Sequence, residues 1–154
     1  MKNYKSYILL LLVLFIFSCD KNNIELTCCD FEISYEKEYG IESNWSSVGI
    51  YNQRSRKEEC AEGGWITFKE DGTFEGSSSC NGMGGKYEIS GSNNIILSDY
   101  SQTLRLCVGN ESEYWEGKFL GELLKSDWFE IEGNKLIMHT SGQTKLVFIA
   151  FEDL

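Results

Sequence analysis

The residues best suited to covalent or metal chemistry are the six cysteines and the single histidine, His139. A cysteine nucleophile such as Cys80 needs a neighbouring base, and His139 is the only imidazole in the chain. Zinc sites draw on closely spaced Cys and His ligands, and the sequence has no C-x-x-C pair. Serine-hydrolase, zinc-peptidase and phosphate-loop motifs are absent as well. We therefore expect no catalytic residues, no metal site and no cofactor, and a cysteine-dependent enzyme ranks last among the functional classes.

Cys19 differs from the other cysteines because it follows directly after an apolar run. Residues 7–17 are apolar without interruption, and Lys2 and Lys5 precede them. The run is roughly half as long as the ~20 residues that a membrane-spanning helix needs. It has the layout of a secretory signal, and Ser18-Cys19 resembles the bacterial lipobox, in which the cysteine receives a diacylglycerol and begins the mature chain. The alternative is an ordinary signal peptide that releases a soluble protein.

Lipidation at Cys19 would attach the mature chain to a membrane through its acyl chains. Each buried CH₂ group contributes about 0.8 kcal/mol, so two or three long chains hold a protein firmly. Asp20 resembles the inner-membrane retention signal of enteric bacteria, which other phyla do not follow. The Asn-, Lys- and Ile-rich, proline-free composition is typical of bacteria in which outer-membrane placement is common. We expect a lipoprotein of the outer membrane that faces the periplasm.

The net charge excludes two classes of partner. The chain has 14 basic and 24 acidic residues, and loss of Lys2 and Lys5 with the signal peptide leaves 12 against 24. Nucleic acid requires Lys and Arg to neutralise its phosphates, and anionic headgroups attract basic segments. We therefore expect no nucleic-acid partner, and a membrane partner only through the N-terminal lipid. The acidity is best explained as a means of keeping an exported protein soluble.

Export also brings the other five cysteines into an oxidising compartment, where such residues usually pair. An odd number leaves at least one over. Cys28 and Cys29 are adjacent and rarely bond to each other, because that strains the peptide between them. A disulfide between Cys60 and one of these neighbours is left open, with Cys29 and Cys60 as the candidate pair.

The chain divides into three segments. We expect a lipoprotein signal peptide at 1–18, a tether and N-terminal extension at 19–44, and one domain with a single core at 45–154. Alternating apolar residues predict strands in this domain, joined in part by glycine-containing turns. The expected strands are Val48–Tyr51, Trp65–Phe68, Thr73–Glu75, Lys86–Ser90, Asn94–Leu97, Trp128–Ile131, Lys135–Thr140 and Thr144–Phe151, with a further extended piece at Thr103–Cys107. A polar loop is expected from Asn52 to Gly64.

One segment has helical periodicity. Trp115, Phe119 and Leu123 recur four residues apart, which predicts a helix over Glu113–Lys125. This stripe is expected to pack on the core. The expected fold class is mainly β (α+β): a curved antiparallel sheet, or a partly open roll or barrel, with one packed α-helix.

The stretch from Gly76 to Tyr87, with the sequence G-S-S-S-C-N-G-M-G-G-K-Y, resembles the signature of META domains. That family includes a bacterial heat-shock lipoprotein. A second family segment, containing a threonine and ending in cysteine, is matched here by T-L-R-L-C between Thr103 and Cys107. The resemblance covers roughly Trp45–Phe151, and a helix and final hairpin follow in the family's order.

The resemblance implies structural roles for the motif. It implies a disulfide between Cys80 and Cys107, which would contribute roughly 3 to 4 kcal/mol to stability. It also suggests a tight turn at positive φ around glycines 82, 84 and 85, with Asn81 hydrogen-bonded to that turn. The motif positions to which we assign such roles are Gly76, Asn81, Gly85, Tyr87 and Thr103. The chain departs from the family pattern at three places, Ser79, Met83 and Arg105.

Two functional classes remain. The first is a lipid-anchored, non-catalytic binding or envelope-maintenance module, which would hold an unknown envelope protein, a glycan or a small ligand. The resemblance supports this class, since META proteins are associated with stress, motility and secretion. The alternative is a pilot-like assembly factor for an envelope or secretion partner. An exposed apolar groove beside the helix would favour the assembly factor, and a closed polar pocket would favour a small ligand.

Overall fold

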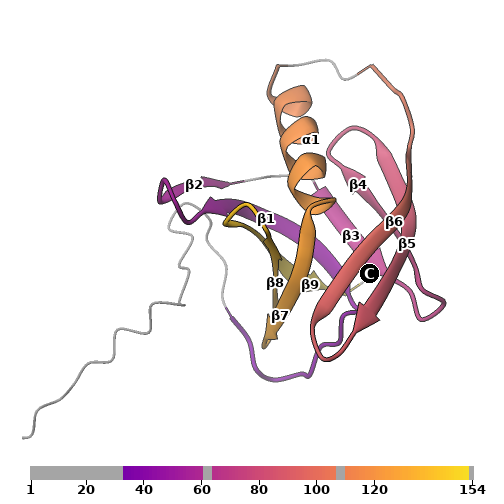
Figure 1. The fold of residues 1–154 in the computed structure, drawn as a ribbon, viewed down its shortest axis with the longest axis vertical. Helices are drawn as coiled ribbons and strands as arrows, with labels where there is room; N and C mark the ends of the chain where they lie inside the picture. The colour runs from indigo at the N-terminus through magenta and orange to yellow at the C-terminus, as the bar shows by residue number, and fades with distance from the viewer. Residues whose placement is uncertain (1–32, 61–63, 107–109, 153–154) are drawn as a thin grey trace, which may run out of the picture.

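The computed structural model describes residues 33–60, 64–106 and 110–152. Within these ranges the chain forms nine β-strands and one α-helix (Figure 1). The strands are β1 (Asn44–Asn52), β2 (Lys57–Cys60), β3 (Gly64–Phe68), β4 (Thr73–Ser78), β5 (Gly82–Ser90), β6 (Asn94–Gln102), β7 (Ser126–Glu132), β8 (Lys135–Thr140) and β9 (Thr144–Phe151), and the helix is α1 (Asn110–Leu123). The predicted mainly β fold with one helix is confirmed.

The strands form a single antiparallel sheet that closes on itself. Their order is β2-β1-β3-β4-β5-β6-β7-β8-β9, and β1 also pairs with β9 along its whole length. The other edge of β1 is shared, because residues 44–46 pair with β3 and residues 49–52 pair with β2. The sheet is therefore a ring, and α1 lies over one end of it (Figure 1).

The strand pairing in the ring is shortest between β6 and β7. The register of these two strands consists of the single pair Asn94 and Trp128. The turn before β6 adds two bonds, because Asn93 Nδ2 donates to the Phe129 carbonyl at 2.8 Å and the Phe129 N–H donates to the Asn93 carbonyl at 2.9 Å. The sheet is thus a closed ring with one narrow seam.

The predicted hairpin turns are present, and glycines make them possible. Gly72, Gly91 and Gly133 have φ values of 79°, 64° and 57°, which suit glycine far better than other residues. The first turn is also held by Asp71, whose Oδ1 accepts bonds from the Thr73 N–H at 2.9 Å and the Thr73 hydroxyl at 2.6 Å. These turns set the register of the strands on either side.

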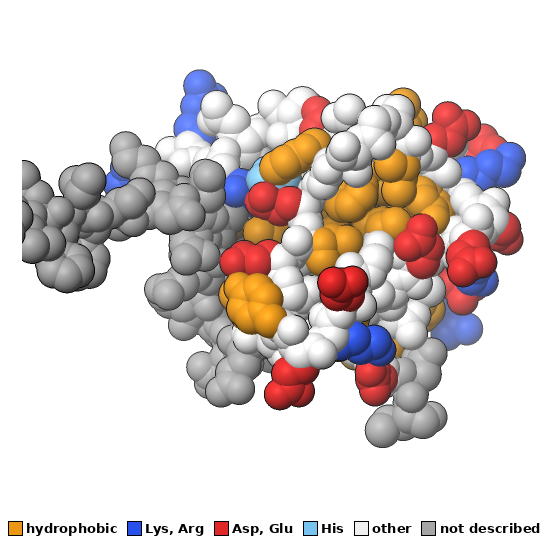
Figure 2. All heavy atoms as spheres, turned by 90° about the horizontal axis from the view of Figure 1, so that it is seen from below, with side chains coloured by type: hydrophobic (Ala, Val, Ile, Leu, Met, Phe, Trp, Pro, Cys, Tyr) orange, Lys and Arg blue, Asp and Glu red, His pale blue; other side chains and the backbone are white. Residues whose placement is uncertain are grey.

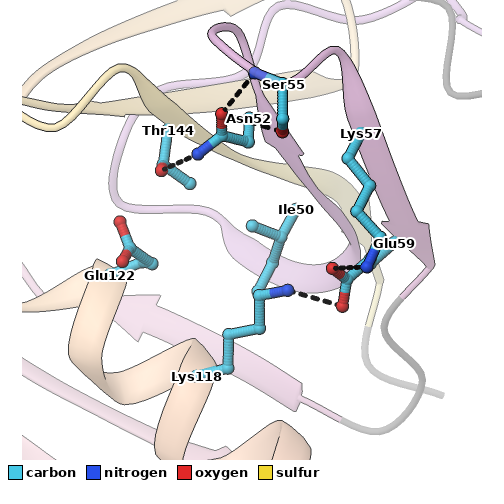
Figure 3. A pocket seen from close by; sticks show the side chains of 8 residues that line it. All are labelled: Ile50, Asn52, Ser55, Lys57, Glu59, Lys118, Glu122 and Thr144. Carbon is cyan, nitrogen blue, oxygen red and sulfur yellow. Dashed lines mark hydrogen bonds and ion pairs between the residues drawn. The ribbon is translucent and has the colours of Figure 1, made fainter.

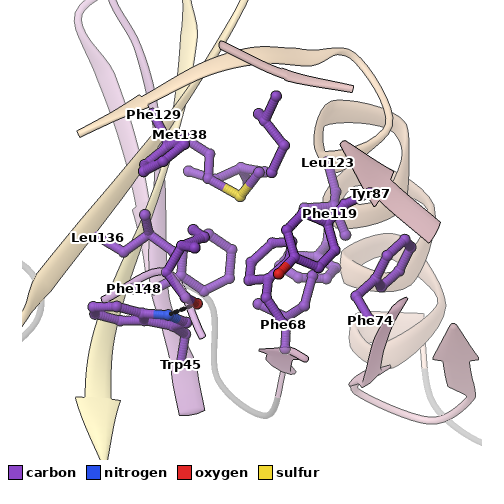
Figure 4. Packing of buried hydrophobic residues seen from close by; sticks show 14 of the residues in the cluster. Trp45, Phe68, Phe74, Tyr87, Phe119, Leu123, Phe129, Leu136, Met138 and Phe148 are labelled. Atoms are coloured by element: carbon purple, nitrogen blue, oxygen red, sulfur yellow. Dashed lines mark hydrogen bonds between the residues drawn. The ribbon is translucent and has the colours of Figure 1, made fainter. Parts of the chain in front are cut away.

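Large apolar side chains from the strands and from α1 fill the interior of the ring (Figure 4). Trp45, Phe68 and Phe148 are fully buried there. Phe119 of α1 meets Phe148 edge to face with 6.0 Å between ring centroids, so the helical stripe does pack on the core. Trp45 Nε1 donates to the Ile41 carbonyl at 2.9 Å, which ties the segment before β1 to the same core.

The end of the molecule opposite α1 has a mixed surface. Hydrophobic side chains are visible in the middle of this face, and acidic side chains are scattered around them (Figure 2). Acidic groups thus surround the apolar centre, in keeping with the excess of acidic over basic residues in the chain.

The last strand is buried on both faces for most of its length, as its apolar run predicts. Leu146 and Phe148 belong to the core, and Val147 between them is fully buried as well. The burial ends before Phe151, which is exposed. The neighbouring β7–β8 turn is covered by an earlier segment, because the Asn134 N–H donates to the Ser34 carbonyl at 3.0 Å.

The polar loop predicted from Asn52 to Gly64 is wrong in part. Residues 57–60 form β2, which pairs antiparallel with the second half of β1. Three of its four residues are charged, so no apolar alternation marks it as a strand. Backbone pairing with β1 and the ion pair between Glu59 and Lys118 of α1 hold it in place instead.

The turn predicted at the motif glycines is also wrong. Gly82, Gly84 and Gly85 lie in β5, and their φ values are not among the positive ones. The chain bends earlier, at Ser79, which has a φ of 95°. Gly85 is needed for space, because a Cβ there would lie 2.6 Å from the Ser98 carbonyl oxygen and 2.7 Å from the Phe74 ring.

Two predicted boundaries shift. Residues 103–106 of the extended piece Thr103–Cys107 are not in a strand, and Cys107 lies outside the described residues. The helix begins at Asn110 and ends at Leu123, whereas Glu113–Lys125 was expected. Helix ends carry weak sequence signals, and here the start differs by three residues and the end by two.

Replacing Gly85 with alanine should destabilise the protein, whereas the same change at Gly117 should not. The methyl group at position 85 would meet backbone and ring atoms closer than 3 Å, so we expect a loss of about 1 to 3 kcal/mol in the free energy of unfolding. Gly117 is an exposed helical residue with nothing within 4 Å of an added Cβ, and alanine there should stabilise by about 0.5 to 1 kcal/mol. Urea denaturation of both variants measures the contrast, and equal effects would contradict the packing described for Gly85.

Candidate functional site

Asn81 of the sequence motif acts as a buried clamp. Its side-chain Oδ1 accepts hydrogen bonds from the Thr103 hydroxyl at 2.9 Å and from the Arg105 N–H at 2.7 Å. Its Nδ2 donates to the Arg105 carbonyl at 3.3 Å. The residue is only 3% exposed, so these bonds satisfy groups that water does not reach. Asn81 therefore fixes the segment after β6 against the start of β5.

The same clamp connects the β4–β5 turn to the helix. The Asn81 carbonyl accepts from the Ser78 N–H at 2.9 Å, and the Ser78 hydroxyl donates to Glu116 of α1 at 3.0 Å. The Gly82 N–H donates to the Thr103 hydroxyl at 3.1 Å. Three separate segments thus meet at Asn81, and the motif links them.

Tyr87 and Gly76 have structural positions as well. The Tyr87 hydroxyl donates to the Lys69 carbonyl at 2.8 Å, and burial is the main cause that raises the pKa of this phenol. A Cβ at Gly76 would lie 2.3 Å from the Trp65 carbonyl oxygen and 2.7 Å from Met83. The motif residues thus hold strands together, and their positions suggest no chemistry.

The cysteines fall into two groups. Cys60 and Cys80 are each disulfide-bonded. The other cysteines, namely Cys19, Cys28, Cys29 and Cys107, lie outside the described residues. The pairings of Cys80 with Cys107 and of Cys29 with Cys60 therefore remain predictions.

His139 lies on the outside of the ring between β7 and β9. Its Nε2 is 2.9 Å from Glu130 Oε1, and its ring centroid is 4.0 Å from that of Trp128. Burial lowers the pKa of His139 and outweighs the opposite effect of Glu130. Among the described residues no group of three or more His, Cys, Asp or Glu is placed to hold a metal ion. The described contacts pair His139 with Glu130 and do not bring it to Cys80.

A polar pocket of about 160 Å³ lies between the β1–β2 hairpin and α1 (Figure 3). We call it the helix pocket, and its lining residues are Ile50, Asn52, Ser55, Lys57, Glu59, Lys118, Glu122 and Thr144. The Glu59 carboxylate accepts hydrogen bonds from Lys118 Nζ at 2.5 Å, from Lys57 Nζ at 3.2 Å and from the Tyr114 hydroxyl at 2.9 Å. The bond from Lys118 is the main cause that lowers the pKa of Glu59 to about 2. These charged side chains bind one another, and the pair of Glu59 with Lys118 attaches β2 to α1.

A second surface lies on the outer face of β3–β6 around Trp65. Along β3, Ile66 and Phe68 point into the core, so Trp65 and Thr67 alternate to the outside. The sheet register continues this outer face across its neighbours as two cross-strand rows. One row is Ile149, Ser46, Trp65, Ser77 and Gly82, and the other is Phe151, Asn44, Thr67, Glu75, Gly84 and Ser101. We call these two rows the tryptophan face.

The tryptophan face is hollowed on both sides of Trp65. A hollow of about 620 Å³ lies over β4–β6, and its lining includes Trp65, Gly82 and Gly84. Another of about 410 Å³ lies toward β1 and β9, and Trp65 and Phe151 line it. Glu75 borders both and binds Lys69 Nζ at 2.6 Å. The Trp65 side chain, 37% exposed, therefore stands as a ridge between two shallow hollows.

The sequence does not predict the tryptophan face, although it contains one signal for it. Trp65-Ile66-Thr67-Phe68 was read as a strand, and its alternation already places Trp65 opposite the two core residues. The sequence alone does not show which residues of other strands surround Trp65. Gly82 and Gly84 come beside Trp65 only through the pairing of β3, β4 and β5.

The described chain is thus a closed antiparallel ring with a helix over one end and a Cys-Asn motif that clamps the segment before that helix. The model of the META domain family matches residues 40–153. The chain therefore belongs to the META domain family. No curated protein matches it.

Solved structures share the fold at low sequence identity. A protein from Burkholderia xenovorans, solved by NMR, has a TM-score of 0.62 and 14% identity, covering 80% of this chain and 97% of its own. A DUF4847 family protein from Bacteroides vulgatus has a TM-score of 0.56 and 18% identity, covering 74% of this chain and 96% of its own. These likenesses support the fold and carry no information about ligands.

The stability of the protein should depend on the ionisation of Glu59. The folded pKa of about 2 is below the ordinary value of 4.5, so Glu59 stabilises the fold fully above pH 4.5. This contribution should be lost as the pH falls from about 4.5 to about 2. We expect Glu59→Gln to reduce the loss of unfolding free energy over this window, measured by urea denaturation at several pH values. Glu70→Gln, at an exposed turn residue, is the control, and an identical pH dependence in wild type and Glu59→Gln would contradict the assignment.

Proposed function

We propose that this META domain protein is a lipid-anchored, non-catalytic binding module of the cell envelope, with the tryptophan face as its binding surface. The observation that carries the proposal is Trp65, a large aromatic side chain that stands exposed between two hollows. A single exposed apolar residue is ordinary on a protein surface. Here the indole offers apolar contact beside two hollows that also hold polar side chains, and ligand sites combine apolar contact area with a few polar groups that fix orientation.

The helix pocket is a weaker candidate for ligand binding. It is polar, and a polar pocket favours a small ligand over an assembly partner. Its charged groups, however, already bind one another, since Glu59 accepts from both Lys57 and Lys118. Its volume of about 160 Å³ is also below the roughly 300 to 1,000 Å³ of common ligand pockets. We assign this pocket a structural role.

The anchoring part of the proposal depends on the first residues of the chain. The apolar run 7–17 followed by Ser18-Cys19 favours export and acylation. In the part of the chain that the structure describes, the helix is not long and apolar enough to cross a membrane. We propose that the lipid on Cys19 holds the domain at the periplasmic face of the outer membrane.

Replacing Cys19 should prevent acylation of the protein. We expect wild-type protein purified from the membrane fraction to lack residues 1–18 and to carry the mass of a diacylglycerol and a further acyl chain. Cys19→Ala should appear in the soluble periplasmic fraction or retain its signal peptide. Intact-mass spectrometry with and without reductant reads out both acylation and the number of disulfides. A wild-type protein that keeps residues 1–18 would contradict the proposal, and Ser6→Ala in the same signal segment is the control.

One observation favours the second candidate, a pilot-like assembly factor. Leu104 and Leu106 are 88% and 92% exposed, although Asn81 holds the backbone of Arg105 between them. Two leucines on a segment fixed in this way offer a preformed apolar contact. A protein partner in the envelope would cover them.

A partner that binds this segment should be lost when its leucines become polar. We expect a photo-crosslinking amino acid at Gln102 to give a specific adduct in cells with the wild-type loop and none with Leu104→Ser/Leu106→Ser. Ile96→Ser changes another exposed apolar residue, 59% exposed on β6, and should leave the adduct in place. An adduct that persists in the double variant, or the absence of any adduct, would exclude this second candidate.

A further inference from the structure

We propose that the tryptophan face binds a neutral saccharide chain, an inference that rests on the proposed binding function and names its ligand class. The first support is the shape of the surface. Trp65 pairs with Ser77 in register, and Ser77 pairs with Gly82, so two small residues continue the row beside the indole. Sugar rings present flat C–H faces, and a flat aromatic side chain over a low floor accommodates such a face.

The second support is the open floor. The nearest atom to an added Cβ at Gly82 is 3.9 Å away, so the space above this residue is open to a ligand. The hollows on the two sides of Trp65 measure about 620 and 410 Å³. Both volumes fall within the range of roughly 300 to 1,000 Å³ typical of ligand sites. An extended chain that crosses Trp65 would occupy both.

The third support is the charge of the lining. Glu75 is the charged residue that lines these two hollows, and neither is lined by Lys or Arg. Anionic polymers need basic groups to neutralise them, and a chain of net charge −10 repels them further. Glu75 is already paired with Lys69 at 2.6 Å, which leaves the surface nearly neutral. A neutral ligand fits this balance better than a phosphorylated or sulfated one.

The fourth support is the kind of polar group on offer. Hydroxyl, amide and carboxylate groups line the hollows on both sides of Trp65, supplied by Asn44, Thr67, Glu75, Ser101, Gln102 and Thr103. The Thr67 hydroxyl donates to Asn44 Oδ1 at 2.7 Å and the Thr103 hydroxyl donates to Asn81 Oδ1 at 2.9 Å, so these hydroxyls are held in fixed orientations. A hydroxyl oxygen that donates one bond still has acceptor capacity for a sugar hydroxyl. A peptide that binds by strand addition needs a free sheet edge, but β3, β4 and β5 are each paired on both sides. The tryptophan face therefore suits a ligand recognised through stacking and hydroxyl hydrogen bonds.

The experiment titrates the full-length protein, solubilised in detergent, with neutral hexasaccharides. The probes are cellohexaose, xylohexaose, mannohexaose, maltohexaose and chitohexaose, and binding is measured by calorimetry and by tryptophan fluorescence. We expect at least one of them to bind, and Trp65→Ala to weaken that binding by about tenfold or more. Trp128→Ala is the matched control, because Trp128 is also 37% exposed but lies on β7, away from this face.

A second variant tests the floor without removing the indole. Gly82→Val fills the open space beside Trp65, and its added side chain meets nothing closer than 3.9 Å at Cβ, so the fold should be kept. We expect this variant to lose binding as Trp65→Ala does, with unchanged urea denaturation.

Several outcomes would overturn the inference. They are the absence of binding to every hexasaccharide, equal binding by wild type and Trp65→Ala, and tighter binding of heparin or of an unstructured peptide than of any neutral sugar. Failure here is distinct from failure of the anchoring proposal. An acylated, membrane-bound protein that binds no sugar would refute the ligand alone, and a sugar-binding protein that keeps its leader would refute the anchor alone.

Discussion

The pairing of β1 with β9 is the constraint on which the rest of the structure depends. β1 meets β9 along its whole length, while its other edge is shared by β3 and β2. This pairing joins the first and last strands of the described chain and turns the sheet into a ring. A ring of so few strands has an interior just wide enough for side chains to fill. The fully buried Trp45, Phe68 and Phe148 fill it, and Phe119 closes the space from the helix.

Two parts of the fold have few backbone hydrogen bonds within the sheet, namely the β6–β7 pairing and the segment after β6. A side-chain amide supplies hydrogen bonds at each of them. At the β6–β7 seam, where the strands share one register pair, Asn93 supplies hydrogen bonds that the ladder lacks. After β6 the chain leaves the sheet, and Asn81 holds it by both backbone groups of Arg105. A buried amide can donate and accept at once, which a carboxylate or a hydroxyl of the same reach does less well. The Cys-Asn motif of the family is explained here by that demand.

The sequence was informative wherever a local pattern determined the structure. The β3–β4 hairpin combines alternating apolar residues with Asp71-Gly72, and both its strands and its turn were predicted. β2 could not be found, because it is charged and is a strand only through its pairing with β1. The motif glycines locally suggest a turn, yet glycine is required at position 85 because Phe74 and Ser98 of other strands leave no room for a side chain. The helix pocket and the tryptophan face are likewise made by residues distant in sequence, and only the register brings them together.

The structural motif and the candidate binding face share strands β4 and β5, and this connects them. Gly76 is buried and pairs with Ile66 in register, and an added Cβ would come within 2.3 Å of the Trp65 carbonyl oxygen. The absence of a side chain at Gly76 thus lets β4 approach β3 at the residue that carries the exposed indole. Gly82 and Gly84 then keep the outer surface low beside it, while Met83 between them packs inward. The segment that carries the family motif therefore supplies both the glycine required for close strand packing and the glycines beside Trp65, so a motif with no chemistry of its own can contribute to the shape of the candidate binding surface.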